Sequence, residues 1–282
     1  MPSTSSATAH AERGTRRRLE WREVGLVKDG INRKEWREQQ PAWGPFVRHR
    51  QRSTPARYPK GRSARDRHHL AVLAQLAAAA LICLDPGHGT IPSVGTQREP
   101  IGPGSHVLKI KDGGGAPGEA PVALAIAFKT RALLRARGYR VAMTRTRDGF
   151  AGGNIARAQF CNERHAALML RIHADGSSNQ SAHGFQTFYP ALHRGWTDDI
   201  YAASLRAARD VQRAAVRATG AKDLGLVPRA DLTGFNWANV PAILVETGYM
   251  TNPPESALLK TAAYQEKVAR GLAAGVSEFV RP

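Results

Sequence analysis

Two histidines and two glutamates stand at the ends of expected secondary-structure elements. His88 lies in a DPGHG turn after the apolar run LICLD, and His173 directly follows ALMLRI. Glu246 ends the strand-like run PAILVE, and Glu119 opens a helical segment after a glycine-rich stretch. Because ligands of α/β sheets bind beyond the carboxyl ends of the strands, the sequence predicts that these four side chains converge on one edge.

This combination of residue types is suited to zinc chemistry. Zinc accepts histidine nitrogen and carboxylate oxygen, and a catalytic zinc typically takes three protein ligands and leaves a fourth position to water. The ion lowers the pKa of that water to about 7 and polarises a carbonyl group. A further carboxylate can take the water proton and pass it to a departing nitrogen. The set therefore predicts cleavage of an amide bond.

Each residue alone has a simpler explanation, and the prediction rests on the four together. A histidine after a strand, such as His173, is more often a surface side chain or a histidine with an ordinary hydrogen bond. Glu119 by itself is an acid of the kind favoured at a helix N-terminus. His88 is more specific, because the preceding proline fixes one dihedral angle and the flanking glycines permit a sharp turn.

Other polar residues compete for places at the same edge. Glu99 lies in the same connection as Glu119, but it stands in a Pro- and Gly-rich loop, whereas a helix start fixes the direction of Glu119. Three loop histidines are expected to be substrate contacts or bystanders: His106, His183 and His193. Asp85 and Asp175 are expected to form turns or to orient the imidazoles.

The elements that must position these residues alternate between strand and helix from Leu81 onward. Expected strands cover residues 81–85, 139–144, 167–172, 184–189 and 241–246. Expected helices cover 118–138, 154–166 with Asn154 as cap, 197–220 with Thr197 as cap, and 254–279. Such alternation predicts a three-layer α/β/α domain with a largely parallel central sheet.

The chain length allows one such domain and a surplus segment before it. Of the 282 residues, 42% are hydrophobic, which is enough for a core in a domain of about 200 residues. Residues 1–66 have no sustained apolar period, so we expect a basic, disordered or wrongly assigned N-terminal extension. Residues 67–80 are expected to be a signal-like apolar segment or a packing helix, and 81–282 the catalytic domain.

The net charge of +18 is concentrated at the start of the chain, where the first 80 residues hold 17 basic and 7 acidic residues. Residues 62–80 place a positive cluster before an apolar run, which is the layout of an export signal although not its usual position. A basic extension could bind nucleic acid, but no zinc finger, stacking motif or amphipathic basic helix accompanies it. It could as easily lie against an anionic cell wall or membrane, and the residues alone leave these partners open.

Two further features limit the classes of protein. No stretch approaches the roughly 18 to 20 apolar residues of a membrane span, so a multi-pass membrane protein is excluded. Cys83 and Cys161 both lie in apolar contexts and are expected to be buried free thiols, although one disulfide remains arithmetically possible.

Four separated motifs resemble, in order, those of the zinc-dependent N-acetylmuramoyl-L-alanine amidases, whose catalytic domain is of the Amidase_3 type. They are LDPGHG, Glu119 with the following ALAIAFKTRALLRARGYRVAMTRTRD, RIHAD and VPAILVETGYMTN. The resemblance extends from about Leu81 to Phe279. Typical members have a glycine where this chain has Thr90 and a lysine where it has Ala120. We expect these two differences to alter affinity or specificity more than activity.

The resemblance implies a function and a site. One zinc ion would be held by His88, Glu119 and His173, with Glu246 as the catalytic acid and base. The substrate implied is peptidoglycan, cut between the lactyl group of N-acetylmuramic acid and L-alanine. Such a protein would be secreted, periplasmic or associated with the cell wall, and we expect a monomer. The alternative is a wall-binding module of the same fold without turnover.

Two connections bear on access to the expected site. Residues 90–118 form an unusually long connection rich in Gly and Pro, which we expect to wall the glycan groove. The link from Tyr189 to Thr197 is short and leaves no room for the blocking helix that regulates some family members. We therefore expect an enzyme that is active without an activator.

Overall fold

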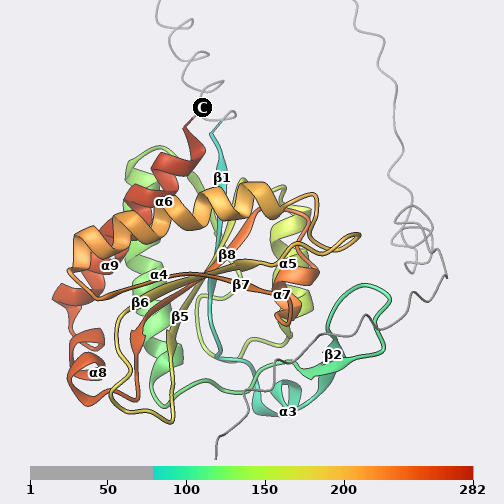
Figure 1. Ribbon diagram of the computed structural model, residues 1–282, viewed down its shortest axis with the longest axis horizontal. Helices are drawn as coiled ribbons and strands as arrows, with labels where there is room; N and C mark the ends of the chain where they lie inside the picture. Colours follow the sequence, from blue (N-terminus) through green and yellow to red (C-terminus); the bar gives the residue numbers. More distant parts are fainter. Residues whose placement is uncertain (1–78, 282) are drawn as a thin grey trace, which may run out of the picture. The chain divides into compact units, whose positions relative to one another are not determined.

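The computed structural model describes residues 79–281 (Figure 1). The predictions made for the basic extension, residues 1–66, and for the signal-like segment up to residue 78 lie outside these residues. Among the helices of the described part, none is long and apolar enough to cross a membrane.

A six-stranded sheet forms the centre of the fold, with strand order β4-β1-β5-β8-β6-β7. Neighbouring strands run parallel except for β6, which pairs antiparallel with β8. The strands are β1 Leu81–Pro86, β4 Arg140–Met143, β5 Leu168–Asp175, β6 Phe185–Pro190, β7 Asp223–Arg229 and β8 Ala242–Tyr249. The predicted largely parallel sheet is confirmed.

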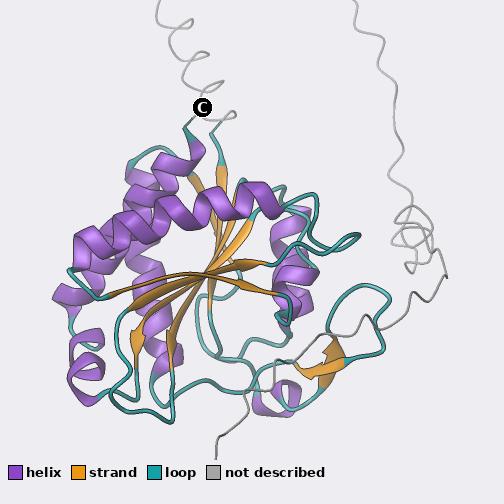
Figure 2. Cartoon of the chain, in the orientation of Figure 1, coloured by secondary structure: helices purple, strands orange, loops and turns teal. Residues whose placement is uncertain are grey.

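Helices cover both faces of this sheet, which completes the predicted three layers (Figures 1 and 2). The longer helices α4, α6 and α9 lie on one face, and the shorter α5 and α7 lie on the other. The helices of the domain are α4 Glu119–Ala136, α5 Asn154–Glu163, α6 Tyr201–Thr219, α7 Thr233–Asn236, α8 Pro253–Leu259 and α9 Ala262–Val280.

Alternate residues of each strand supply two separate cores. Ile82 and Leu84 of β1 pack with the long helices, whereas Cys83 between them packs toward α5 and α7. The same alternation holds in β5, where Leu168 and Leu170 face the larger core. Central strands buried on both faces explain why the sequence shows continuous apolar runs instead of an alternating pattern.

Two predicted helix caps are wrong. Asn154 is the first residue of α5, and the carboxylate of Glu99 accepts hydrogen bonds from the backbone N–H groups of Asn154 and Ile155 at 2.7 and 3.3 Å. The Thr197 hydroxyl donates back to Ala191 O at 2.6 Å and stabilises a turn, so α6 begins four residues later than predicted. The start of α5 depends on a residue far away in the sequence, and the start of α6 depends on a hydrogen bond to a preceding residue. A local cap pattern shows neither contact.

Two further elements differ from the prediction. The expected closing helix is divided, because the Thr261 hydroxyl accepts from Tyr264 N at 3.2 Å and starts α9 as a separate helix after α8. Strand β7 was not predicted, since Gly225 and Pro228 interrupt its pattern. Its position at the edge of the sheet tolerates the proline.

The long connection between β1 and α4 carries its own secondary structure. It contains the short helix α3, Pro92–Gly95, and a hairpin of β2, Arg98–Pro100, with β3, Leu108–Ile110. The indole N–H of Trp237 donates to Pro100 O at 3.0 Å, and the Asn236 amide donates to Ile101 O at 3.0 Å. These contacts attach the hairpin to α7.

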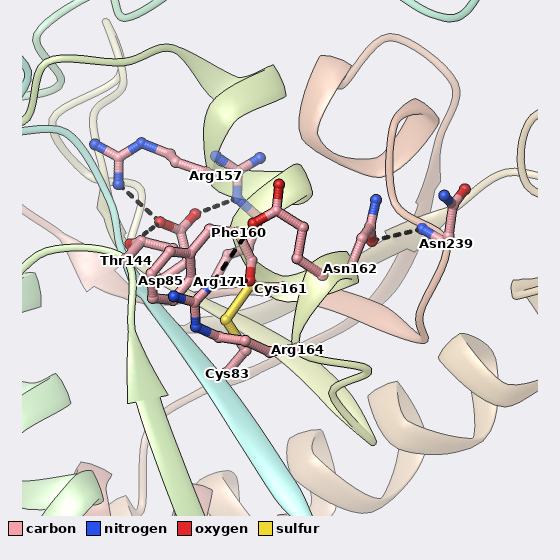
Figure 3. The surroundings of a disulfide bond; sticks show 11 residues. Cys83, Asp85, Thr144, Arg157, Phe160, Cys161, Asn162, Arg164, Arg171 and Asn239 are labelled. Carbon is pink, nitrogen blue, oxygen red and sulfur yellow. Dashed lines mark hydrogen bonds and ion pairs between the residues drawn. A yellow bond between two sulfur atoms is a disulfide. The ribbon is translucent and has the colours of Figure 1, made fainter. Parts of the chain in front are cut away.

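The prediction of free thiols is wrong, because Cys83 and Cys161 form a disulfide (Figure 3). Both residues are fully buried, and their Cα atoms lie 5.7 Å apart although 78 positions separate them in the sequence. The bond joins β1 to α5. Its physical reason is the packing of α5 on the sheet face toward which Cys83 points, a contact that sequence spacing does not show.

Candidate metal centre

The structure brings together three of the four residues singled out from the sequence as one group of possible metal ligands. One ligand atom each from His88, Glu119 and His173 lies within 4.8 Å of the others. Glu246 lines the same open cleft, whose volume is about 560 Å³. His88 follows β1, Glu119 starts α4, His173 lies near the end of β5, and Glu246 lies on β8.

Local backbone geometry explains this convergence. His173 and Glu246 are register partners on the parallel strands β5 and β8, so both side chains reach the same edge. His88 has a φ of 55°, an uncommon conformation for a residue with a side chain. A Cβ atom at Gly87 would lie only 2.3 Å from the His173 ring, so glycine is needed where the turn passes this imidazole.

One oxygen of Glu119 lies between the two imidazoles. Oε1 is 3.1 Å from His88 Nε2 and 3.0 Å from His173 Nδ1, and the ring centroids are 4.9 Å apart at a steep angle. The other oxygen, Oε2, accepts from the backbone N–H of Ala116 at 2.9 Å. The carboxylate is thus fixed by its surroundings as well as by its place at a helix start.

Two buried atoms of this cluster have no hydrogen-bond partner within residues 79–281: His173 Nε2 and Glu246 Oε2. A buried polar atom without a partner is costly unless a ligand or solvent satisfies it. Imidazole nitrogen and carboxylate oxygen are the donor types that zinc prefers. The three-residue group His88, Glu119 and His173 therefore fits a divalent metal ion, and Glu246 beside it remains free for other chemistry.

The electrostatics of the cluster separate its two glutamates. Burial would raise the pKa of Glu119, but its hydrogen bonds to His173 and His88 outweigh this and hold it well below the usual value. Burial, followed by the charges of Asp175 and Glu119, raises the pKa of Glu246 well above 4.5. One carboxylate is thus stabilised as an anion, and the other is driven toward its protonated form.

The two histidines differ in the same way. Burial alone would lower the pKa of His88, but hydrogen bonds to Asp112 and Glu119 raise it to about 9. For His173 burial dominates over the hydrogen bond to Glu119, so its pKa is lowered. A divalent cation at this position would compete with the protons of both imidazoles.

Asp112 is a residue of the site that sequence reasoning missed. Its Oδ1 lies 2.6 Å from His88 Nδ1, so that a carboxylate from the long connection holds the outer nitrogen of this imidazole. The only local signal is the DGGG sequence, in which an aspartate precedes three glycines in a loop. No periodicity relates it to a strand end or a helix start.

Two buried arginines hold the backbone of the turn that carries His88. Arg145 donates to the carbonyls of Pro86 and Gly87 at 3.0 and 2.7 Å, and also to Ala120 O at 2.8 Å. Arg157 donates to His88 O at 2.7 Å. Arg145 thus connects the turn after β1 to the first residues of α4, where Glu119 lies.

Asp85 does not orient an imidazole, so this part of the prediction is wrong. The fully buried Asp85 is paired with Arg157 at 2.7 Å and Arg171 at 2.8 Å, and it accepts from the Thr144 hydroxyl at 2.6 Å (Figure 3). It lies opposite Arg171 in the β1–β5 register. Asp85 and these partners form a buried charged cluster next to the candidate metal centre.

The remaining candidates from the sequence lie elsewhere or at the edge of the cleft. Glu99 caps α5, and Asp175 lines the cleft and accepts from Gly176 N at 2.7 Å. The three loop histidines are exposed and do not line the cleft: His106, His183 and His193. His193 stacks on Trp196 with ring centroids 4.0 Å apart.

Known proteins of one family are similar to this chain. The sequence model of the family described as N-acetylmuramoyl-L-alanine amidase, Amidase_3, matches residues 82–278. The N-acetylmuramoyl-L-alanine amidase Rv3717 of Mycobacterium tuberculosis is 32% identical over 216 residues, which cover 72% of this chain and 87% of the relative.

Solved structures give the same result. The crystal structure of the N-acetylmuramyl-L-alanine amidase Ami1 from Mycobacterium smegmatis is similar with a TM-score of 0.63 and 31% identity, covering 72% of this chain and 97% of that one. The apo form of Ami1 from Mycobacterium abscessus is similar with a TM-score of 0.65 and 29% identity, covering 72% and 100%. The chain therefore belongs to the N-acetylmuramoyl-L-alanine amidase family of the Amidase_3 type.

Proposed function

We propose that the protein is a zinc-dependent amidase that cleaves the bond between N-acetylmuramic acid and L-alanine in peptidoglycan. The observation that carries this proposal is a pair of buried atoms, His173 Nε2 and Glu246 Oε2, that have no hydrogen-bond partner within residues 79–281 and lie in one open cleft with His88 and Glu119. Family membership supplies the substrate class, since its relatives are named as N-acetylmuramoyl-L-alanine amidases.

Three residues would hold the ion and a fourth would move protons. His88, Glu119 and His173 supply two nitrogens and an oxygen, which leaves a coordination position open. When bound, zinc would make water a better nucleophile and polarise the carbonyl of the amide. Glu246 would accept the proton of the attacking water and deliver it to the leaving nitrogen of L-alanine.

Burial suits Glu246 to this role. Burial raises the pKa of Glu246, which makes its carboxyl group a better proton acceptor and lets it hold a proton before delivering it, as a general base and acid must do in turn. Glu246 is not among the proposed ligands, so its carboxylate would stay free to bind and release a proton while the ion is bound. The acid and base step thus depends on Glu246 alone.

The long connection would supply one wall of the substrate cleft. Gly113, Gly115, Ala116 and Pro117 line it on one side, and the turn after β5 lines it on another. Small residues leave room for a polymeric substrate that enters from an open side. In the described part of the chain, residues 191–200 between β6 and α6 form turns and no helix, which agrees with activity that needs no activator.

The disulfide supports a place of action outside the cytoplasm. Structural disulfides form and persist in oxidising compartments, and peptidoglycan also lies there. We propose a secreted, periplasmic or wall-associated enzyme. The basic residues 1–66 would then meet anionic envelope polymers.

The products formed from purified peptidoglycan test the proposal. The zinc-loaded protein should release stem peptides that begin with a free L-alanine amino group and leave glycan strands with intact disaccharides, as mass spectrometry can show. Cut glycosidic bonds or shortened peptides would contradict the assigned bond. Binding to peptidoglycan without any release would favour the alternative, a wall-binding module of the same fold.

A further inference from the structure

Asp112 lies outside the four family motifs, yet among the described residues it makes the shortest polar contact to a proposed ligand. It stands between β3 and α4, and its Oδ1 is 2.6 Å from His88 Nδ1. On the other side of the same ring, His88 Nε2 is 3.1 Å from Glu119 Oε1. The imidazole is thus held between a carboxylate at its outer nitrogen and the proposed ligand cluster at its inner one.

This arrangement determines which nitrogen of His88 can bind a metal. An ionised carboxylate only accepts hydrogen bonds, so Asp112 requires a proton on Nδ1. In the neutral ring the lone pair is then on Nε2, which faces Glu119 and His173. Metal-binding histidines commonly donate their other N–H to a carboxylate, which fixes the ring and makes the ligand nitrogen more basic.

Asp112 is itself held firmly. Its Oδ2 accepts from Thr90 N at 3.2 Å, and its Oδ1 also accepts from Gly114 N at 2.9 Å. Its own backbone N–H donates to Gly95 O at 3.1 Å. The carboxylate is thus anchored from both ends of the long connection, so it can hold His88 in one orientation.

The glycines after Asp112 let the chain pass directly over the cluster. Gly114 and Gly115 have φ values of 83° and 70°, which residues with side chains rarely adopt. A Cβ atom at Gly115 would lie 2.5 Å from both Glu119 Oε2 and the His88 ring. Close approach to two proposed ligands therefore explains the glycine at Gly115, and the positive φ explains the glycine at Gly114.

We propose that Asp112 is a positioning residue of the metal centre, which fixes the His88 imidazole with Nδ1 protonated and Nε2 directed at the ion. It does not contact the ion and acts only through His88. The expected consequence is tighter zinc binding by the whole cluster. This inference rests on the proposed metal centre.

Zinc affinity of the full chain, measured by competition with a chromophoric chelator, tests it. Removal of such an outer carboxylate lowers metal affinity by about 10-fold to 100-fold in comparable sites, and we expect this for Asp112→Ala. For Asp112→Asn we expect a loss of about 3-fold to 10-fold, because a neutral amide oxygen still accepts from Nδ1–H but roughly half as strongly.

Asp223→Asn is the matched control. Asp223 Oδ1 accepts from Gly225 N at 2.8 Å, which is the same local turn that Asp112 makes with Gly114, but its side-chain partner is the Gln212 amide at 2.6 Å and not an imidazole. Its zinc affinity should equal that of the wild type. The ¹⁵N chemical shifts of His88 in the zinc-loaded protein give a second measure, because they report which ring nitrogen carries the proton, and a purely structural role of Asp112 would not change them.

The outcomes separate this inference from the proposed function. Wild-type affinity in Asp112→Ala would overturn the role of Asp112 alone, while the metal centre would stand. If that variant does not fold, Asp112→Asn decides, and unchanged affinity there has the same meaning. Wild-type protein that binds no zinc would overturn the metal centre and this inference together.

Discussion

Two buried charged clusters lie next to the turn after β1. They differ in whether all of their polar atoms have hydrogen-bond partners. In the first, Asp85 is paired with Arg157 and Arg171 and bonded to Thr144. In the second, formed around Glu119, His173 Nε2 and Glu246 Oε2 lack partners among the described residues. Only three positions along the chain separate Asp85 from His88.

The difference distinguishes a structural cluster from a binding site. A buried ion pair with complete hydrogen bonding holds the fold together, and loss of one partner is costly. A buried polar group without a partner does not stabilise the fold as such an ion pair does. It is found where a ligand or a reaction needs that group. Substitutions in the first cluster should therefore affect folding, and substitutions in the second should affect chemistry.

The largest effect is expected for Glu246→Gln. Loss of the proton-transfer group should lower the rate of amide cleavage by about 10²-fold to 10⁴-fold, measured as stem-peptide release from peptidoglycan. The free energy of unfolding should stay equal or rise, because a neutral amide replaces a buried carboxylate whose Oε2 has no hydrogen-bond partner among the described residues. Strong destabilisation with retained turnover would reverse the assignment of the two clusters.

Asp85→Asn should show the opposite pattern. It removes the counter-charge of two buried arginines, and the free energy of unfolding should fall by about 3–5 kcal/mol in urea titrations. The control is Asp210→Asn, whose partner Arg213 is exposed, and its loss should be much smaller. Equal losses in both variants would show that the Asp85 cluster is not structural.

Removal of the disulfide should lower the free energy of unfolding by less than Asp85→Asn does. The double variant Cys83→Ala, Cys161→Ala frees a loop of 78 residues in the unfolded chain and should lose about 2–4 kcal/mol of stability. Thermal unfolding with and without a reducing agent measures it. We expect zinc affinity to change little, since neither cysteine contacts a proposed ligand; a large loss of affinity would show that the clusters are coupled.

The smallest effect concerns pH. Burial would raise the pKa of Asp85, but Arg157 and Arg171 outweigh it and hold this pKa well below 3.8. A carboxyl whose folded pKa is lowered stabilises the protein above its unfolded pKa and loses this contribution as the pH falls toward the folded value. The stability difference between wild type and Asp85→Asn should therefore shrink below about pH 4, whereas a constant difference would contradict this linkage.

The sequence allowed prediction of those parts of the site that depend on local pattern. Strand ends and helix starts are encoded by apolar runs and turn residues, so His88, His173, Glu119 and Glu246 could be placed at one edge. The largely parallel sheet that brings these strand ends to one edge was also predicted and is confirmed, whereas the strand order was not predicted.

What could not be predicted depends on contacts between distant segments. The disulfide requires α5 to pack against the Cys83 face of β1, and neither residue carries a local signal of its partner. Asp112 lies in a glycine-rich loop without periodicity, and its role appears only when the loop passes over His88. The capping of α5 by Glu99 is of the same kind.

We propose that three side chains, His88, Glu119 and His173, hold one zinc ion on which amide cleavage depends. Titration of zinc into metal-free protein, with stem-peptide release measured at each step, tests it most directly. We expect activity that is absent at the start, rises with added zinc and stops rising at one ion per chain. Full turnover in the metal-free protein, or a rise that continues to two ions, would contradict it.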